Sequence, residues 1–110
     1  MAALPTQVPP LAGLAVDFDA AAGGGDTCLT GAGVLLLVRN GDAGSHTVTL
    51  VTPGTVDGLA IADRAIPVAA GAIEAIPVTN AYRNPSTGQA NITYDGVTSV
   101  EVAVIRVAVA

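Results

Sequence analysis

Two apolar runs joined by a short polar link form the most constraining stretch of the chain, from Gly33 to Pro53. The first run, Val34 to Val38, is continuously apolar, as in strands that are covered on both faces. The second run, His46 to Thr52, alternates, with Val48 and Leu50 on one side and threonines on the other. Because the link is rich in Gly, Asn, Asp and Ser, the stretch predicts a β-hairpin with a covered central strand beside a half-exposed one.

Short strand-like runs recur along the rest of the chain, separated by Gly, Asn or Asp turns. The further expected strands are Leu14 to Ala20, Leu59 to Asp63, Ala65 to Val68, Ala75 to Val78, Gln89 to Asp95 and Thr98 to Val109. Leu59 and Ile61 are expected to point inward. About eight short strands at this spacing predict an all-β domain. The expected fold is a single-domain β-sandwich, immunoglobulin-like or jelly-roll-like, with a small β-barrel as the alternative.

A four-residue sequence occurs twice, as Ala65-Ile66-Pro67-Val68 and as Ala75-Ile76-Pro77-Val78. The two prolines and the intervening Gly71 argue against a helix. We expect a hairpin of two short strands near a sheet edge, with each proline where the ladder is unpaired. Alternatively, the repeat is a coincidence in an Ala-rich chain.

The first 13 residues carry no charge and three prolines, so they are expected to be extended and outside the interior of a sheet. We assign residues 1–13 to an N-terminal arm and residues 14–110 to the β-sandwich domain. One interpretation of the arm is a floppy terminus. The other is a segment that lies on a neighbouring subunit, with Leu4, Val8 and Leu11 as its anchors.

The last expected strand becomes apolar on both faces beyond Val102. Its second face carries Ile105, Val107 and Val109, which a strand ending in water would not need. Either this strand is central to its sheet, or the second face meets a partner.

The charge pattern excludes several classes of partner. The net charge is −5, there is no Lys, and four Arg residues are scattered singly, whereas nucleic-acid binding needs clustered cations. The same reasoning disfavours an anionic membrane surface. Only 12% of the residues are charged, about half the usual share. The surface is therefore either small and rich in Ala and Thr, or partly an interface in an assembly.

The sequence predicts neither a transmembrane helix nor a signal peptide. No apolar stretch approaches the length of about 18 residues that a membrane-spanning helix needs. The N-terminus lacks a basic region, and Pro5, Pro9 and Pro10 interrupt its apolar residues. Synthesis in the cytoplasm is therefore expected.

Few residues offer catalytic or metal-binding chemistry, so we expect neither an enzyme nor a cofactor. His46, the only histidine, is expected to be a surface or turn residue. Cys28, the only cysteine, allows no internal disulfide and is expected to be a small buried hydrophobe. These two form the only conceivable thiol–imidazole pair, but no third residue supports it. Asp17, Asp19 and Asp26 form either a calcium site or an exposed strand face beside a Gly-rich loop.

The strand pattern of residues 30–107 resembles small β-sandwich proteins encoded among the head genes of tailed bacteriophages, several of which are similar to capsid decoration (cement) proteins. The matching segments are Gly33 to Gly41, Thr47 to Pro53, Asp57 to Arg64, Ile76 to Val78 and Val102 to Arg106. The resemblance implies a non-catalytic protein on the outer surface of the phage head that stabilises the shell. It implies the major capsid protein as partner, self-association with a trimer favoured, and an N-terminal arm that reaches the capsid.

Two other functions fit the sequence. One is a head-completion or tail-associated structural protein. The other is a bacterial immunoglobulin-like adhesive or carbohydrate-binding module, which the absence of Trp and of a secretion signal disfavours. If the N-terminal arm binds the capsid, deleting residues 1–13 should leave folding intact and weaken binding.

Overall fold

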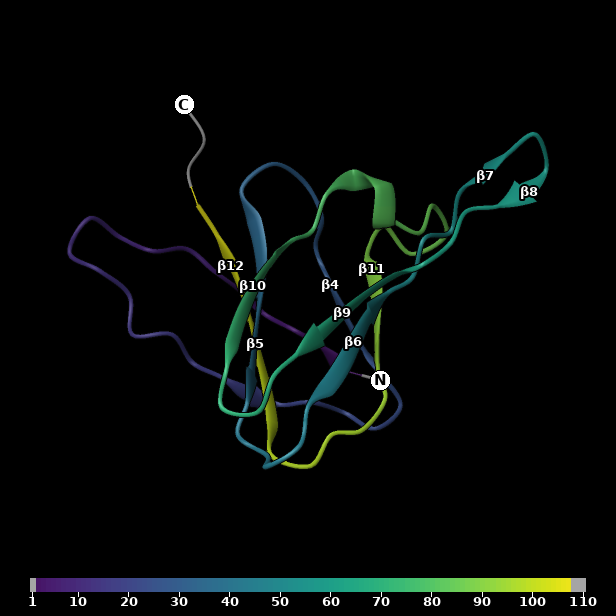
Figure 1. The fold of residues 1–110 in the computed structure, drawn as a ribbon. Coiled ribbons are helices and arrows are strands. Elements are labelled where there is room, and N and C mark those ends of the chain that lie inside the picture. Colours follow the sequence, from purple (N-terminus) through teal and green to yellow (C-terminus); the bar gives the residue numbers. More distant parts are fainter. Residues whose placement is uncertain (1, 108–110) are drawn as a thin grey trace.

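The computed structural model describes residues 2–107, which form an all-β sandwich with a small projecting hairpin (Figure 1). The strands are β1 (Ala2–Ala3), β2 (Thr6–Gln7), β3 (Asp19–Ala20), β4 (Asp26–Cys28), β5 (Val34–Asn40), β6 (His46–Leu50), β7 (Thr55–Val56), β8 (Leu59–Ala60), β9 (Arg64–Val68), β10 (Ile73–Pro77), β11 (Ala90–Tyr94) and β12 (Val100–Arg106). A 3₁₀ turn, η1, spans Asn80–Tyr82. The predicted all-β fold is confirmed. Within residues 2–107, no helix is long and apolar enough to cross a membrane.

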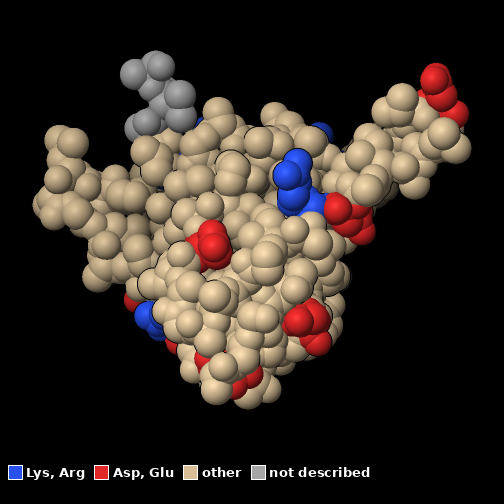
Figure 2. All heavy atoms as spheres, viewed as in Figure 1, with Lys and Arg blue, Asp and Glu red and all other residues tan. Residues whose placement is uncertain are grey.

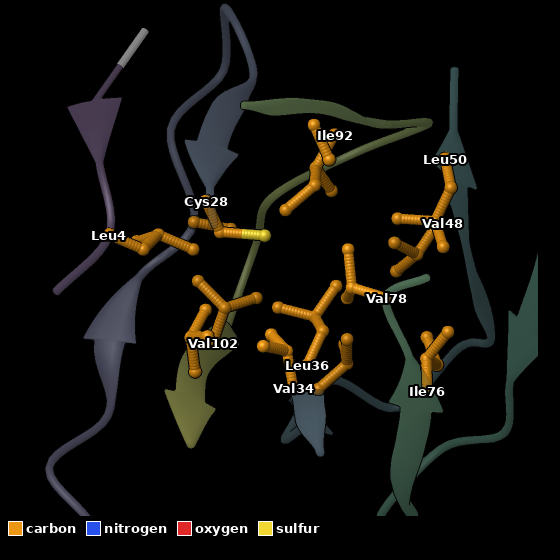
Figure 3. Close-up of a cluster of buried hydrophobic side chains, with 14 of the residues drawn as sticks. Leu4, Cys28, Val34, Leu36, Val48, Leu50, Ile76, Val78, Ile92 and Val102 are labelled. Carbon is orange, nitrogen blue, oxygen red and sulfur yellow. The ribbon is translucent and has the colours of Figure 1, made fainter. Parts of the chain in front are cut away.

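Two five-stranded sheets make up the sandwich. Sheet A has the strand order β1-β4-β11-β6-β9. Sheet B has the order β10-β5-β12-β2, and β3 also pairs with β12. Because side chains alternate across a strand, every second residue of each long strand faces the other sheet. These inner residues, among them Leu36, Val102, Leu50 and Ile92, form one buried aliphatic core (Figure 3).

The predicted hairpin between β5 and β6 is wrong, although both strands exist. β5 pairs with β10 and β12 in sheet B, whereas β6 pairs with β9 and β11 in sheet A. Residues 41–45 therefore carry the chain from one sheet to the other. A link of this length does not force its two strands to pair as a two-residue turn would. β5 is central to its sheet, as expected, but its burial alternates along the strand, so it is covered on one face only.

The repeated tetrapeptides also lie in two strands that do not pair with each other. β9 pairs with β6 and β10 pairs with β5, so each lies at the edge of a different sheet. The prediction of Pro-containing edge strands is therefore correct, but the predicted hairpin is wrong. Pro67 and Pro77 are tolerated because an edge strand needs only one hydrogen-bonded side.

Asn40, at the end of β5, joins two of the connections between the sheets, residues 41–45 and residues 69–72. Its side chain is fully buried, and its Nδ2 donates to the backbone oxygens of Gly44 at 2.9 Å and Val68 at 3.0 Å. The Oδ1 atom of Asn40 accepts a hydrogen bond from the backbone N–H of Asp42 at 3.0 Å. The backbone oxygen of Asn40 accepts a second one from the backbone N–H of Gly71 at 2.7 Å. One amide thus fixes the path of the chain between the two sheets.

The N-terminal residues are part of the sandwich, which corrects the assignment of residues 1–13 to a separate arm. β1 pairs with β4 at one edge of sheet A, and β2 pairs with β12 at one edge of sheet B. Between them Leu4 is 7% exposed and packs into the core (Figure 3). Residues 2–7 thus span the edges of the two sheets, so deleting residues 1–13 would damage the fold rather than leave it intact.

Residues 8–18 leave the edge of sheet B as a loop and return to it (Figure 1). The expected strand from Leu14 to Ala20 is reduced to the two residues of β3. The base of the loop is closed by Gln7, whose side-chain amide donates to the backbone oxygen of Asp17 at 2.9 Å and accepts its N–H at 3.0 Å. This is the form of an Ω-loop, in which the two ends lie close together.

The β7–β8 hairpin projects from the body on the side opposite to the loop (Figure 1). Asp57 and Gly58 both have positive φ, 52° and 76°, as a two-residue type I′ turn requires. Leu59 and Ile61 are 73% and 41% exposed, so the expectation that they point inward is wrong. The hairpin extends beyond the sandwich, and no second sheet lies over these side chains to bury them.

Candidate interaction surface

The outer face of sheet B is almost entirely apolar. In the register of its three long strands, Leu37 lies between Ala75 and Ala103, and Leu35 lies between Pro77 and Ile105. We call this surface the apolar face, and it comprises Leu35, Leu37, Ile73, Ala75, Pro77, Ala103 and Ile105. Leu35, Leu37 and Ile105 are half-buried, Ala103 is only 3% exposed and Ile73 is 58% exposed, so the face is most accessible along β10.

Polar groups lie at two places on the described part of this face: Gln7 lies beside Ile105 on the edge strand β2, and Arg39 and Glu101 lie opposite each other at one end. The Arg39 Nη2 atom is 2.7 Å from Glu101 Oε1, and its guanidinium carbon is 4.2 Å from the centre of the Phe18 ring. The aromatic ring and the cation attract each other through the negative face of the ring. Phe18 thereby holds the returning end of the 8–18 loop over this end of the apolar face.

The outer face of sheet A has a different composition. Thr27 lies opposite Asn91, and Thr49 lies opposite Thr93. These short polar side chains hydrogen-bond water readily, which is the usual pattern for the solvated face of an antiparallel sheet. The molecule thus has one ordinary outer face and one apolar outer face.

The interface residues predicted from sequence have different locations in the structure. Ile105 lies on the apolar face, and Val107, just after β12, is 45% exposed. Val8 and Leu11, on the projecting loop, are 63% and 111% exposed. Leu4 is buried in the core of its own chain, so its assignment as an anchor on a neighbouring subunit is wrong. Val109 lies outside the described residues.

Sequence reasoning missed most of the apolar face. Leu35 and Leu37 were expected to lie within a strand covered on both faces, and Ala75 in a hairpin that does not form. Their common surface depends on the order β10-β5-β12, which brings segments distant in sequence together. In the sequence, this face was indicated by the last strand, which is apolar on both of its faces beyond Val102 and contains Ile105.

His46 lies between two carboxylates at one end of sheet A. Its Nε2 is 2.8 Å from Asp42 Oδ2 and its Nδ1 is 3.1 Å from Asp95 Oδ1. The hydrogen bond to Asp42, and then that to Asp95, raises the pKa of His46 above its usual value. In turn, the hydrogen bond from His46 lowers the pKa of Asp42. A backbone hydrogen bond from Thr47, and then His46, lowers that of Asp95. Both ring nitrogens are engaged, so the imidazole acts as a clamp between two loops.

Cys28 and the aspartates offer no reactive cluster. Burial, and then the charge of Asp26, raises the pKa of the Cys28 thiol to about 11, which keeps it protonated at neutral pH. Asp26 is fully buried and accepts a 2.7 Å hydrogen bond from the Tyr94 hydroxyl. Asp17 and Asp19 are exposed instead, so the three aspartates do not converge. Within residues 2–107, no group of three or more His, Cys, Asp or Glu side chains has metal-binding geometry.

The distribution of charge on the surface is sparse. On the face shown in Figure 2, acidic and basic side chains are few, and wide uncharged areas lie between them. Comparison of the chain with protein-family models, with curated proteins and with solved structures finds no match in any of the three. The function is therefore inferred from the apolar face and from the loop of residues 8–18.

Proposed function

We propose that this chain is a structural virion protein: a non-catalytic capsid decoration, or cement, protein that binds the outer surface of a phage head and stabilises the shell. Its partners are the major capsid protein and further copies of itself, with a trimer favoured, and its location is the capsid surface after synthesis in the host cytoplasm. The sequence resemblance supplies the class of partner. The apolar face is the observation that supports docking.

A soluble sandwich needs only its inner faces for stability, so an aliphatic outer face favours a protein partner. Complete burial of one Leu or Ile side chain contributes roughly 1.5–3 kcal/mol, before the costs of association. Leu35, Leu37 and Ile105 are already half-buried, so each would contribute only part of this value, in addition to the contribution of the more exposed Ile73. An oligomer that engages several capsid sites at once would gain further through effective concentration.

The loop of residues 8–18 supplies a second contact at one end of the same sheet. Leu11 is fully exposed and Val8, at the base of the loop, is 63% exposed, so both can contact a partner. Leu11→Ser removes apolar surface without touching the core, unlike deletion of residues 1–13. We expect this variant to fold normally and to bind heads less tightly.

Cosedimentation with phage heads through a density gradient tests the proposal, with the chain quantified against the major capsid protein. A ratio near one copy per capsid subunit, or a fixed sizeable fraction of it, supports a decoration protein. A few copies per particle would instead indicate the head-completion or tail-associated alternative. Absence from heads would overturn the phage assignment and favour the immunoglobulin-like adhesive module.

A further inference from the structure

The β7–β8 hairpin is amphipathic although it lies outside the sandwich. Val56 and Leu59 are paired across the two strands, so they share one face, and Ile61 continues that face. The three side chains are 62%, 73% and 41% exposed. An isolated two-stranded hairpin is marginally stable in water and gains stability when its apolar face packs against something else.

An apolar groove lies where the edge strands β9 and β10 of the two sheets meet η1. Its volume is about 250 Å³, and its lining consists of Arg64, Ile66, Ile76, Pro77, Thr79 and Tyr82. This is below the roughly 300 Å³ at which small-molecule pockets begin. It exceeds the roughly 150 Å³ cavity that holds one benzene molecule, so a pair of aliphatic side chains fits.

The charges of the two features are complementary. The hairpin carries Asp57 at its tip, and the groove carries the exposed cation of Arg64. The neighbouring acid, Asp63, already accepts the backbone N–H of Thr52 at 2.8 Å. A carboxylate that approaches the groove from outside would therefore meet the Arg64 guanidinium beside an apolar surface.

We infer that the β7–β8 hairpin of one copy occupies the β9–β10 groove of a second copy. Val56 and Leu59 fill the groove, and Asp57 pairs with Arg64. The tip of the hairpin points away from the body of its own chain (Figure 1), so it does not reach its own groove. The contact is the same whether two copies exchange hairpins or several close a ring. It would account for the self-association included in the proposed function, but it needs no capsid, so it can fail while capsid binding stands.

Sedimentation velocity of the purified chain over a range of concentrations tests the inference. The wild-type chain should associate reversibly, and Leu59→Ser should raise the apparent Kd roughly 30-fold or more. Ala60→Ser is the matched control, since Ala60 is exposed and pairs with Thr55 on the face of the hairpin opposite to Val56 and Leu59. It should leave the Kd unchanged, and thermal unfolding should show that both variants are folded.

Charge reversal identifies the pair of surfaces. Asp57→Arg and Arg64→Asp should each weaken self-association about tenfold. An equimolar mixture of the two variants should associate more tightly than either variant alone, because an arginine on one chain can then meet an aspartate on the other. A wild-type chain that stays monomeric, a Leu59→Ser variant that associates normally, or a mixture that is no tighter than its components would overturn the inference.

Discussion

The two sheets have similar inner faces and dissimilar outer faces. Leu50 and Ile92 in sheet A, and Leu36 and Val104 in sheet B, are all fully buried between the sheets. On the outside, the three central strands of sheet A pair threonines and asparagine, with Ala65 and Pro67 on the edge strand β9, whereas sheet B aligns leucine, alanine, proline and isoleucine. Both faces follow the same alternation along their strands, so the backbone does not account for the difference.

The inner faces explain why the chain folds, and both sheets contribute to them. An outer face does not need apolar side chains for folding. The threonine pairs of sheet A are polar side chains of the kind expected on a face in contact with water. The aliphatic outer positions of sheet B therefore reflect a different neighbour, which we propose is protein. Four measurements test this difference between the outer faces of the two sheets.

The largest effect is expected at Asn40, which joins the sheets and belongs to neither outer face. Asn40→Ala leaves the backbone oxygens of Gly44 and Val68, and the N–H of Asp42, without their partner. Since each buried unpaired group is costly, we expect a loss of about 3 kcal/mol in the free energy of unfolding. Urea denaturation measures it.

Asn91→Ala provides the matched control, because Asn91 lies on the outer face of sheet A. Its effect should stay within about 0.5 kcal/mol. Equal effects of the two substitutions would show that the outer face of sheet A contributes to folding, and the contrast between faces would fail.

The second measurement places the same charge on each outer face. Ala75→Lys, on the apolar face, should weaken binding to phage heads by roughly 30-fold, since an ammonium group would be buried without a partner. Thr93→Lys, on the outer face of sheet A, should change binding less than about twofold. Ala75 and Thr93 are both exposed, so neither variant should lose stability. Equal loss of binding in both would refute the assignment of the apolar face as the docking surface.

The third measurement follows stability with pH at the end of sheet A. Folding raises the pKa of His46, so protonated His46 stabilises the folded state. This stabilisation is complete below about pH 6.5 and is lost as pH rises through the pKa of His46 in the folded protein. The lowered pKa values of Asp42 and Asp95 give a contribution that is present above about pH 3.8 and lost as pH falls through their folded values. Stability should therefore be greatest at mildly acidic pH.

His46→Gln should abolish the decline in melting temperature between about pH 6 and 9, because the titrating imidazole is gone. Asp95→Asn should retain a smaller decline, since Asp42 still binds the ring. An unchanged pH profile in His46→Gln would show that the clamp does not contribute to stability.

The smallest effect is expected at the ion pair that interrupts the apolar face. Arg39 and Glu101 are 42% and 41% exposed, so water screens their attraction. Glu101→Gln should cost at most about 0.5 kcal/mol of unfolding free energy. A loss above about 1.5 kcal/mol would show that sheet B depends on its outer face for folding, and would contradict the conclusion that the inner faces alone account for stability.

Local patterns in the sequence located most of the strands. The alternation around Val48 and Leu50 and the two proline-containing edge strands follow from side-chain period and from the hydrogen bond that proline cannot donate, which act within a few residues. The same reasoning wrongly predicted that Leu59 points inward. Alternation of apolar and polar residues identifies the apolar face of a strand but does not show what covers that face. The burial of Leu4 was missed for the converse reason, since a single apolar residue directly before a proline shows no periodic pattern.

By itself, the sequence determined the all-β class, the aliphatic character of the core and the shortage of charge. Tertiary structure alone decided which strands pair, and with them the apolar face, the His46 clamp and the groove beside Arg64. Pairing is decided by contacts between segments far apart in the chain, such as Leu37 with Ala75 and Ala103, or Asn40 with Val68. A local pattern specifies the two faces of a strand, but the neighbours on each side are chosen by the packing of the whole sandwich.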